Sequence, residues 1–391
     1  MNERLRIAVV GGSIGGLTAA VLLHELGHDV EVFERSSEAL QSRGAGIVVL
    51  PMTERYFTER GGEDRVSLEL KWWKYVDREG SELSADADYF RFSSWNTVYW
   101  ALLEAFPDDR YHLNAEMVGF DQDDDTVILH LADGSTVAVD LLVCADGVTS
   151  TARNILLPEV GPTYTGYVAW RGVAHEGDLS PETLSQLEDA MLYQVLDPGH
   201  ILVYAIPDAD GSIAPGSRLQ NFVWYRNYLA GDEHQDLMTD IHGEVRSSSV
   251  PPGFLRAAHL TEMRASAAQL APPIREVVLS SHEPFVQTVF DLESPRMVFG
   301  RVCIIGDAAF SARPHVAAGT AKAAADAWGL REALRDTEDL ATALRDWETQ
   351  QLELGRTVVE RSREMGQQSQ FEGTMVPGDP KWKFGLFEAG N

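Results

Sequence analysis

The chain of 391 residues contains only two cysteines, Cys144 and Cys303. Two cysteines cannot form the disulfide framework that holds many small secreted domains together. Each lies in an apolar run, LLVCAD or RVCIIGD, so both are expected to be small core residues. The histidines and cysteines show no spacing typical of metal ligands, and we predict no metal site.

Basic residues are also scarce, with 32 Lys and Arg against 60 Asp and Glu, a formal net charge of −28. Neutralising phosphates requires Lys and Arg, so this imbalance argues against nucleic acid as a partner. It argues equally against binding to anionic membrane surfaces. The net charge carries no information about the substrate of a buried site.

A long uninterrupted apolar run is missing as well. Residues 7–23 are mostly apolar, but glycines interrupt them where a turn is expected. We interpret this stretch as a strand and a helix rather than a signal peptide or a membrane span. The protein is therefore expected to be soluble and cytoplasmic.

The opening segment has the pattern of a complete β-α-β unit. A short apolar strand is expected at residues 5–10, a glycine-rich turn at 11–16 and a second strand at 30–33, with an apolar-faced helix between them. The length of the chain leaves room for one or two further domains and for a large core.

The turn sequence GGSIGG is typical of a dinucleotide-binding site. Glycines allow the backbone to approach a pyrophosphate, and the helix N-terminus offers free N–H groups to the anion. Ser13 stands where the second glycine of G-x-G-x-x-G is expected, and its hydroxyl could donate to a phosphate oxygen. The cofactor-binding residues predicted in this unit are Gly11, Ser13, Ile14, Gly15, Gly16, Glu34 and Arg35.

The middle of the chain has a different pattern. From about residue 166 to 285, apolar and polar residues alternate with a period of two, which predicts antiparallel strands. The chain then returns to a buried strand at 301–305, an alanine-rich helix, and a long amphipathic helix at about 338–370. This order predicts a sheet domain inserted into a nucleotide-binding domain.

Two later segments carry further motifs. Residues 144–153 (CADGVTSTAR) contain D-G-x-x-S-x-x-R, and residues 301–330 contain G-D-A-A…P…G…D-A. Together with the first turn, and in the same order, they resemble the three fingerprints of the single-component FAD-dependent aromatic hydroxylases, the class A flavoprotein monooxygenases.

This resemblance implies an α/β fold with a Rossmann-like FAD-binding domain, an inserted antiparallel-sheet substrate domain and a long C-terminal helix. We place the FAD-binding domain at 1–70, 96–165 and 286–391, and the substrate domain at 71–95 and 166–285. In the family, the G-D aspartate binds the ribityl chain and the loop after the proline passes the isoalloxazine ring. The further FAD contacts implied are Arg43, Asp146, Asp307, Pro314, Ala317, Ala318 and Gly319.

The chain departs from the family at several positions. Phe310, Ala317 and Ala321 replace the His, Gly and Asn of many members, and residues 95–100 lack an arginine that contacts FAD in many relatives. The R-P-H-x-A-A-G-x-A-K loop and the terminal PGDPKWKFGL are similar to the 2,6-dihydroxypyridine 3-hydroxylases. Relatives on this scaffold also act on other pyridinols, phenols and indoles, so the likeness alone does not identify the ring.

The resemblance implies that NAD(P)H binds transiently, reduces the flavin and leaves. The sequence agrees with this, since it shows no second glycine-rich β-α-β unit for a nicotinamide nucleotide. Oxygen would then form a C4a-hydroperoxyflavin, which passes its terminal OH to an electron-rich ring. His315 is our first candidate for a substrate contact or proton acceptor, with a loop-shaping role equally open. Tyr204 and Trp224 either face the pocket or belong to the core, and Arg171 either binds an anionic substrate oxygen or, as we favour, pairs with a carboxylate.

The expected partners are therefore a small aromatic substrate and O2, with a homodimer suggested by analogy. Three other hypotheses remain. One is a monooxygenase of the same fold that acts on a natural product or antibiotic. Another is a catalytically silent flavin-binding sensor. The third is an NAD-dependent dehydrogenase, which would not need the second and third fingerprints.

Overall fold

A parallel sheet forms the first layer of the computed structural model, which describes residues 4–40, 46–62, 66–336 and 339–391. Its strand order is β17-β18-β10-β1-β2-β6, and all neighbouring pairs except β17–β18 are parallel. The strands are β1 (Arg6–Val10), β2 (Asp29–Phe33), β6 (Tyr111–His112), β10 (Leu141–Cys144), β17 (Val298–Phe299) and β18 (Val302–Ile304).

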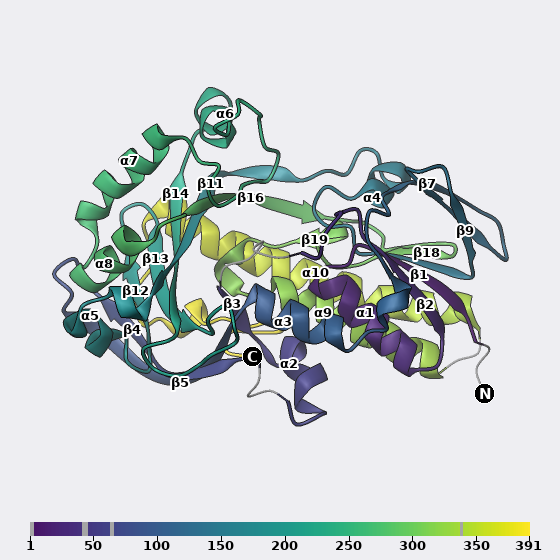
Figure 1. Ribbon diagram of the computed structural model, residues 1–391, viewed down its shortest axis with the longest axis horizontal. Helices are drawn as coiled ribbons and strands as arrows, with labels where there is room; N and C mark the ends of the chain where they lie inside the picture. Colours follow the sequence, from purple (N-terminus) through teal and green to yellow (C-terminus); the bar gives the residue numbers. More distant parts are fainter. Residues whose placement is uncertain (1–3, 41–45, 63–65, 337–338) are drawn as a thin grey trace.

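Helices cover this sheet and bury its strands. β10 is buried at all four positions, as its continuous apolar sequence requires for a strand covered on both faces. Figure 1 shows α1 and α9 side by side below the sheet, next to α3. The helices around this layer are α1 (Ile14–Glu25), α2 (Pro51–Thr58), α3 (Trp95–Glu104), α4 (Thr151–Leu156) and α9 (Gly319–Asp336).

A small antiparallel sheet with the order β7-β8-β9 extends from this layer at the edge of the molecule (Figure 1). Its strands are β7 (Met117–Gln122), β8 (Val127–Leu131) and β9 (Thr136–Val139). Asp133 and Gly134 form the turn between β8 and β9, with Gly134 at φ 87°, as their sequence predicts for a hairpin.

The second large sheet has ten strands in the order β15-β16-β11-β14-β13-β12-β4-β5-β3, with β19 paired to β16. Every pair is antiparallel except β12–β4, so the sheet is mixed. The strands are β3 (Gly46–Val49), β4 (Leu68–Val76), β5 (Glu82–Ser94), β11 (Thr163–His175), β12 (Ala190–Val195), β13 (His200–Ile206), β14 (Leu219–Asn227), β15 (Ser249–Val250), β16 (Phe285–Glu293) and β19 (Phe310–Ser311).

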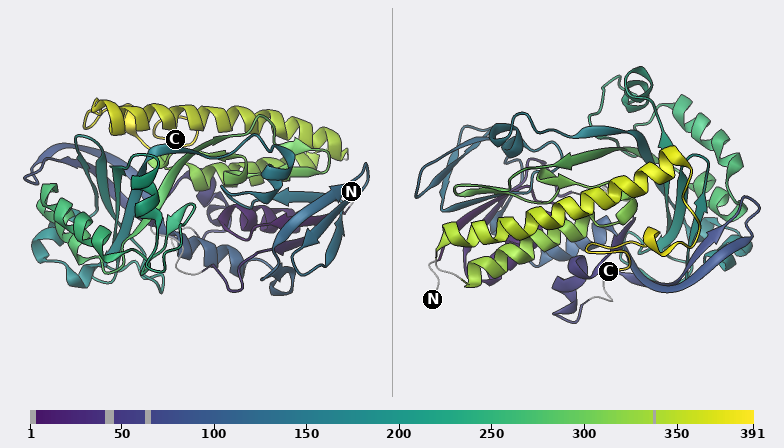
Figure 2. Two further views of the ribbon diagram at one scale, coloured as in Figure 1. Left: turned by 90° about the horizontal axis from the view of Figure 1, so that it is seen from above. Right: turned by 180° about the vertical axis from the view of Figure 1, so that it is seen from behind.

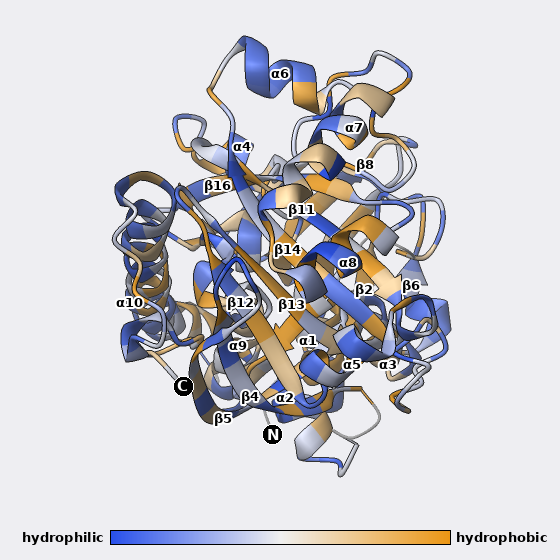
Figure 3. Ribbon diagram, turned by 90° about the vertical axis from the view of Figure 1, so that its left-hand side faces the viewer, coloured by the Kyte–Doolittle hydropathy of each residue, from blue (hydrophilic) through white to orange (hydrophobic). Residues whose placement is uncertain are grey.

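Both faces of this sheet are buried, and its central strands are strongly apolar in Figure 3. On one face, Trp170 and Trp224 pack in one cluster with Ile274 of a covering helix. The opposite face carries the cavity described below. The helices of this region are α5 (Pro181–Leu187), α6 (Asp232–Met238), α7 (Ala257–Ser266) and α8 (Pro272–Ser280).

The helix α10 (Leu340–Gln367) joins the two layers and continues into a π-helical turn, η7 (Gln368–Glu372). It contacts α9 and the first layer at one end, and β16 and the loop at Pro314–Val316 further along. Figure 2 shows it in yellow, running along the length of the molecule. None of the helices described is long and apolar enough to cross a membrane.

The observed architecture confirms the predicted fold class. Two features were not predicted. The helices α7 and α8 lie within the region expected to hold mainly strands, and β4 pairs in parallel with β12. The large sheet also includes β3, which pairs with β5, and the N–H of Gly46 donates to Oδ1 of Asn221 on β14 (2.8 Å). The domain boundaries remain a prediction, and the strands of the large sheet cross them at both ends.

Candidate active site

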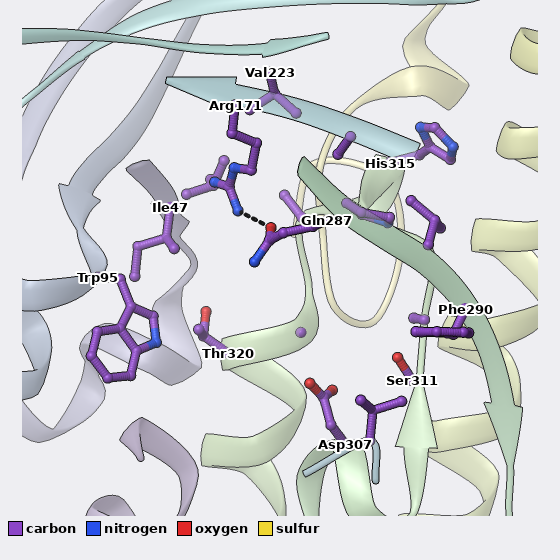
Figure 4. Close-up of a pocket in the computed structure, with 18 of the residues that line it drawn as sticks. Ile47, Trp95, Arg171, Val223, Gln287, Phe290, Asp307, Ser311, His315 and Thr320 are labelled. Atoms are coloured by element: carbon purple, nitrogen blue, oxygen red, sulfur yellow. Dashed lines mark hydrogen bonds between the residues drawn. The ribbon is translucent and has the colours of Figure 1, made fainter. Parts of the chain in front are cut away.

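A cavity of about 480 Å³ lies between the two large sheets. One end is lined by the β1–α1 turn, the segment after β10, and the start of α9. The other end is lined by β3, β11, β13, β14 and β16 of the large sheet. Figure 4 shows this arrangement, with Asp307 and Ser311 toward one end and Arg171 and Gln287 toward the other.

The glycine-rich turn at the first end is closely packed. A side chain on Gly11 would place its Cβ 2.4 Å from the carbonyl oxygen of Ala145, and Gly11 has φ 97°. A Cβ on Gly16 would lie 1.8 Å from the oxygen of Gly11. Both positions therefore require glycine. Ser13, Ile14 and Gly15 line the cavity, and the N–H groups of the first turn of α1 are available to an anion.

Glu34 lies at the end of β2, next to this turn. Its carboxylate is buried and accepts hydrogen bonds from the backbone N–H groups of Gly12 (2.8 Å) and Ser36 (2.9 Å). Each carboxylate oxygen retains a lone pair that could accept a ribose hydroxyl. Arg35 is exposed, and neither it nor Glu34 lines the cavity itself. Arg43 lies outside the described residues.

The second fingerprint, at residues 144–153, is hydrogen-bonded to the third, at residues 301–330. Ser150 caps α4 by accepting from the N–H of Arg153 (2.9 Å). The buried guanidinium of Arg153 donates to the carbonyl oxygens of Val148 (2.7 Å) and Ala308 (3.1 Å). This arginine therefore joins the segment after β10 to the turn that carries Asp307.

Asp146 has an unsatisfied carboxylate oxygen. Its Oδ2 accepts from the N–H of Ala152 (3.2 Å), while its Oδ1 is buried without a partner in the part of the chain described. Burial raises the pKa of Asp146, and hydrogen bonds from Ser150 and Ala152 oppose that rise. A buried oxygen with no partner is expected to be satisfied by a bound group.

Asp307 lies on the cavity wall, in the turn η5 (Gly306–Ala308). Its side chain is exposed toward the open cavity, and desolvation by the surrounding protein raises its pKa to about 6. The ammonium of Lys322 acts in the opposite direction. Lys322 itself pairs with Asp326 (2.5 Å), whose second oxygen accepts the N–H of Gly306 (2.8 Å).

The loop before α9 forms the next part of the wall. Pro314, Ala317 and Gly319 line the cavity, whereas Ala318 is buried behind them. Ala317 has φ 55°, so this alanine holds a left-handed conformation that glycine adopts more readily. Helix α9 begins at Gly319, with its positive end at the cavity.

These features fit FAD. The N-terminus of α1 would hold the pyrophosphate, Glu34 the adenosine ribose and Asp307 the ribityl hydroxyls. The N-terminus of α9 would favour negative charge on the flavin ring. Asp146 does not line the cavity itself, but its neighbours Ala145 and Gly147 do, and its Oδ1 has no hydrogen-bond partner among the described residues.

The sheet end of the cavity contains Arg171. Its guanidinium donates to Oε1 of Gln287 (2.9 Å) and to the carbonyl oxygen of Gly46, while its Nε has no partner in the described part of the protein. Among the ion pairs of the described residues, none involves Arg171. The structure therefore contradicts the carboxylate pairing that we favoured from the sequence, and the hydrogen bonds of Arg171 within the described residues are to neutral groups.

His315 lies in the turn η6 (Pro314–Val316), with its Nε2 2.7 Å from the hydroxyl of Tyr167. Its ring centroid is 4.7 Å from Tyr225 and 5.1 Å from His200, which also line the cavity. Burial lowers the pKa of His315 to about 3, with a smaller contribution from Arg313. The imidazole is therefore neutral at physiological pH.

The structure separates the two aromatic candidates. Tyr204 lines the cavity, but Trp224 is only 1% exposed and packs on the opposite face of β14. Its neighbours Val223 and Tyr225 take the cavity side. Trp224 is thus a core residue, because successive side chains of a strand point to opposite faces.

Several cavity residues were not predicted from the sequence. Gln287 is a polar residue within the apolar run of β16, which was the one available signal. Tyr225 belongs to the same aromatic pair as Trp224, and a pattern of period two does not indicate which member faces the site. The other cavity residues missed are Tyr193, His200 and Phe384, together with Tyr167, which lies behind the wall and contacts His315.

One end of the cavity has the features of an FAD-binding site, and the other end is lined by aromatic side chains of the large sheet. Together they define a flavin-dependent oxidoreductase that acts on a small ring. Comparison with known proteins supports this class. Residues 9–39 match the family described as NAD(P)-binding Rossmann-like domain, and residues 164–291 match the family described as FAD binding domain-like.

Among curated proteins, the chain is 41% identical over 384 residues to the 2,6-dihydroxypyridine 3-monooxygenase of Paenarthrobacter nicotinovorans, covering 97% of this chain and 96% of that protein. It is 28% identical to the 6-hydroxynicotinate 3-monooxygenase of Bordetella bronchiseptica, covering 90% and 89%. The solved structure of 2,6-dihydroxypyridine-3-hydroxylase from Arthrobacter nicotinovorans has a TM-score of 0.94 at 39% identity, covering 100% of this chain and 98% of that one. The chain belongs to the class A FAD-dependent aromatic monooxygenases.

Proposed function

We propose that the protein hydroxylates a hydroxypyridine, using FAD, NAD(P)H and O2. The observation that carries this proposal is the sheet end of the cavity, where Arg171, Gln287 and His315 lie among tyrosine side chains. This combination suits a single planar ring that carries polar substituents. The similarity to the hydroxypyridine monooxygenases, which extends over nearly the whole chain, supports the same substrate class.

The bound flavin, once reduced by NAD(P)H, would supply the chemistry that activates O2 and delivers one of its oxygen atoms to the ring. The balance is one ring C–H, O2, NAD(P)H and a proton giving one ring C–OH, water and NAD(P)+. The tightly packed walls would exclude bulk water, which otherwise favours release of hydrogen peroxide.

The protein side chains would orient the ring and adjust its charge. The free N–H of Arg171 would bind a ring oxygen and favour its anionic form, which makes the neighbouring ring carbon more nucleophilic. Gln287 would position that oxygen together with Arg171. His315, neutral and held by Tyr167, would contact the ring from the loop beside the flavin site.

The test is NADH and NADPH oxidation by the FAD-loaded protein with and without 2,6-dihydroxypyridine, with product mass measured in the same sample. We expect strong stimulation and a product heavier by one oxygen. Stimulation with peroxide only would mean that the true substrate is a differently substituted ring. Without stimulation, the hydroxypyridine proposal would fall and the natural-product alternative would be tested next.

Arg171→Met tests the site itself. We expect the KM for the ring to rise by about tenfold or more, because a charged donor to a substrate oxygen is removed. Arg345→Met, on the outer surface of α10, is the matched control and should not change KM. Equal KM values for the two variants would remove Arg171 from the substrate site.

A further inference from the structure

The last residues of the chain form an irregular tail that packs against the large sheet. Trp382, Phe384 and Leu386 are 2%, 4% and 2% exposed, and they belong to the same core cluster as Trp73 and Tyr193. The view from behind in Figure 2 shows this yellow segment returning from the end of α10 to the middle of the molecule. The tail is therefore an integral part of the fold.

Phe384 reaches the cavity. Its ring centroid lies 4.6 Å from Trp73 and 5.5 Å from Phe90, on β4 and β5, and the side chain lines the cavity together with Tyr193. The two neighbouring rings prevent Phe384 from moving away from the cavity without opening the core. This wall of the cavity is thus supplied by a residue only seven positions from the chain end.

The tail also holds the loop that carries His315. The N–H of Gly385 donates to the carbonyl oxygen of Val316 (3.0 Å), which is adjacent to His315. The guanidinium of Arg361, on α10, donates to the carbonyl oxygen of Lys383 (3.2 Å). The backbone on both sides of Phe384 is therefore hydrogen-bonded, before it to α10 and after it to the loop that borders the cavity.

We infer that Phe384 is a specificity-determining residue, which limits the cavity to a single aromatic ring and, through Gly385, fixes the loop at His315. The inference rests on the proposed function, since it concerns the size of the ring accepted. Removing the phenyl group would open space for a second fused ring and would leave a single ring loosely held.

The experiment compares Phe384→Ala, Phe384→Leu and a control, Phe387→Ala, in the holoenzyme. Phe387 lies in the same tail but is 50% exposed. The dissociation constants of 2,6-dihydroxypyridine and of a fused two-ring analogue, 2,4-dihydroxyquinoline, are measured by perturbation of the flavin absorbance, which requires no turnover. Iodide quenching of flavin fluorescence reports the openness of the cavity independently of any ring.

For Phe384→Ala we expect the preference for one ring over two to fall by about tenfold or more, with increased iodide quenching. Phe384→Leu should show an intermediate change, and it decides the question if the alanine variant fails to retain FAD. Phe387→Ala should match the wild type. Equal ring preference and equal quenching in Phe384→Leu and Phe387→Ala would overturn the inference.

A failure of the proposed function can be distinguished from a failure of the inference about Phe384. If the wild-type protein binds neither ring, the proposed function fails. The quenching difference between the Phe384 and Phe387 variants then still tests whether Phe384 closes the cavity. If the wild type binds the single ring and the Phe384 variants do so with unchanged affinity and preference, the proposed function stands and the role of Phe384 is rejected.

Discussion

The hydroxyl of Tyr167 lies 2.7 Å from Nε2 of His315, although the two residues are separated by 148 positions. Both side chains are buried, and the guanidinium of Arg313 lies close to the tyrosine, with its Cζ 5.8 Å from the ring centroid. A nearby cation favours the orientation of the hydroxyl in which its oxygen lone pairs, and not its proton, point toward the cation. Tyr167 is therefore expected to donate its proton to Nε2, which places the proton of His315 on Nδ1.

Tyr167→Phe tests this arrangement. Without its hydroxyl partner, His315 would be less firmly oriented, and we expect the KM for the ring to rise by about five- to tenfold. FAD affinity should stay unchanged, since Tyr167 does not line the cavity. Steady-state kinetics and FAD titration of the variant check this, with Tyr89→Phe, on the exposed side of β5, as control. An unchanged KM would mean that packing alone orients His315.

The buried histidine also predicts a pH dependence of stability. The pKa of His315 is about 3 in the folded protein, whereas an unfolded histidine titrates near its usual value. Protons therefore bind the unfolded chain more tightly, and the stabilisation present above about pH 6.5 is lost as the pH falls toward 3. Between pH 7 and 5.5 this histidine should account for a loss of about 1 kcal/mol.

Urea unfolding of the apoprotein at these two pH values measures the effect. His315→Gln should reduce the pH dependence by that amount, and His282→Gln, at an exposed position, should leave it unchanged. Since burial also lowers the pKa of His200, the variant should retain part of the dependence. The same slope in His315→Gln and wild type would contradict a neutral buried His315.

Asp307 predicts a pH dependence of cofactor binding. Its pKa is about 6, and only the ionised carboxylate is a pure acceptor for ribityl hydroxyls. Protonation removes this acceptor, so FAD affinity should weaken as the pH falls below 6, by at most about tenfold per pH unit. Titrating apoprotein with FAD at pH 8 and pH 5 tests this. Asp307→Asn should bind FAD with nearly equal affinity at both pH values, while Asp121→Asn should behave like wild type.

The buried pair of Lys322 and Asp326 predicts a large stability effect. The two side chains are 3% and 0% exposed, and Asp326 also accepts the N–H of Gly306. Lys322→Met leaves a buried carboxylate without its cation and should cost about 3–5 kcal/mol of unfolding free energy. Adding Asp326→Asn removes the charge and keeps an acceptor for Gly306, so most of the loss should be recovered.

Denaturant unfolding of the single and double variants measures this coupling. Glu82→Gln is the comparison, because it breaks the more exposed pair with Lys74 and should cost less than about 1 kcal/mol. Additive effects of the Lys322 and Asp326 substitutions would show that the two charges do not depend on each other.

The cofactor end of the site could be predicted from the sequence because its parts are local. Gly11, Ser13 and Gly15 lie within one turn, so the motif can be recognised in a short stretch of sequence, although the Cβ contact that requires glycine at position 11 is made with Ala145. Asp307 and Pro314 likewise lie in one short segment that follows a buried strand. Arg153 could be predicted only as part of a fingerprint, and its bond to Ala308 required the fold.

The substrate end was decided by tertiary structure alone. Both faces of β14 are buried, so the apolar pattern of the strand is equally compatible with Trp224 or Tyr225 facing the cavity, and only the packing of the helices on one face selects Tyr225. The sequence by itself determined the nucleotide-binding turns, because steric and hydrogen-bonding demands on neighbouring residues leave few alternatives. The contacts of Tyr167 with His315 and of Phe384 with Trp73 join distant segments, and they exist only because the whole chain folds around one cavity.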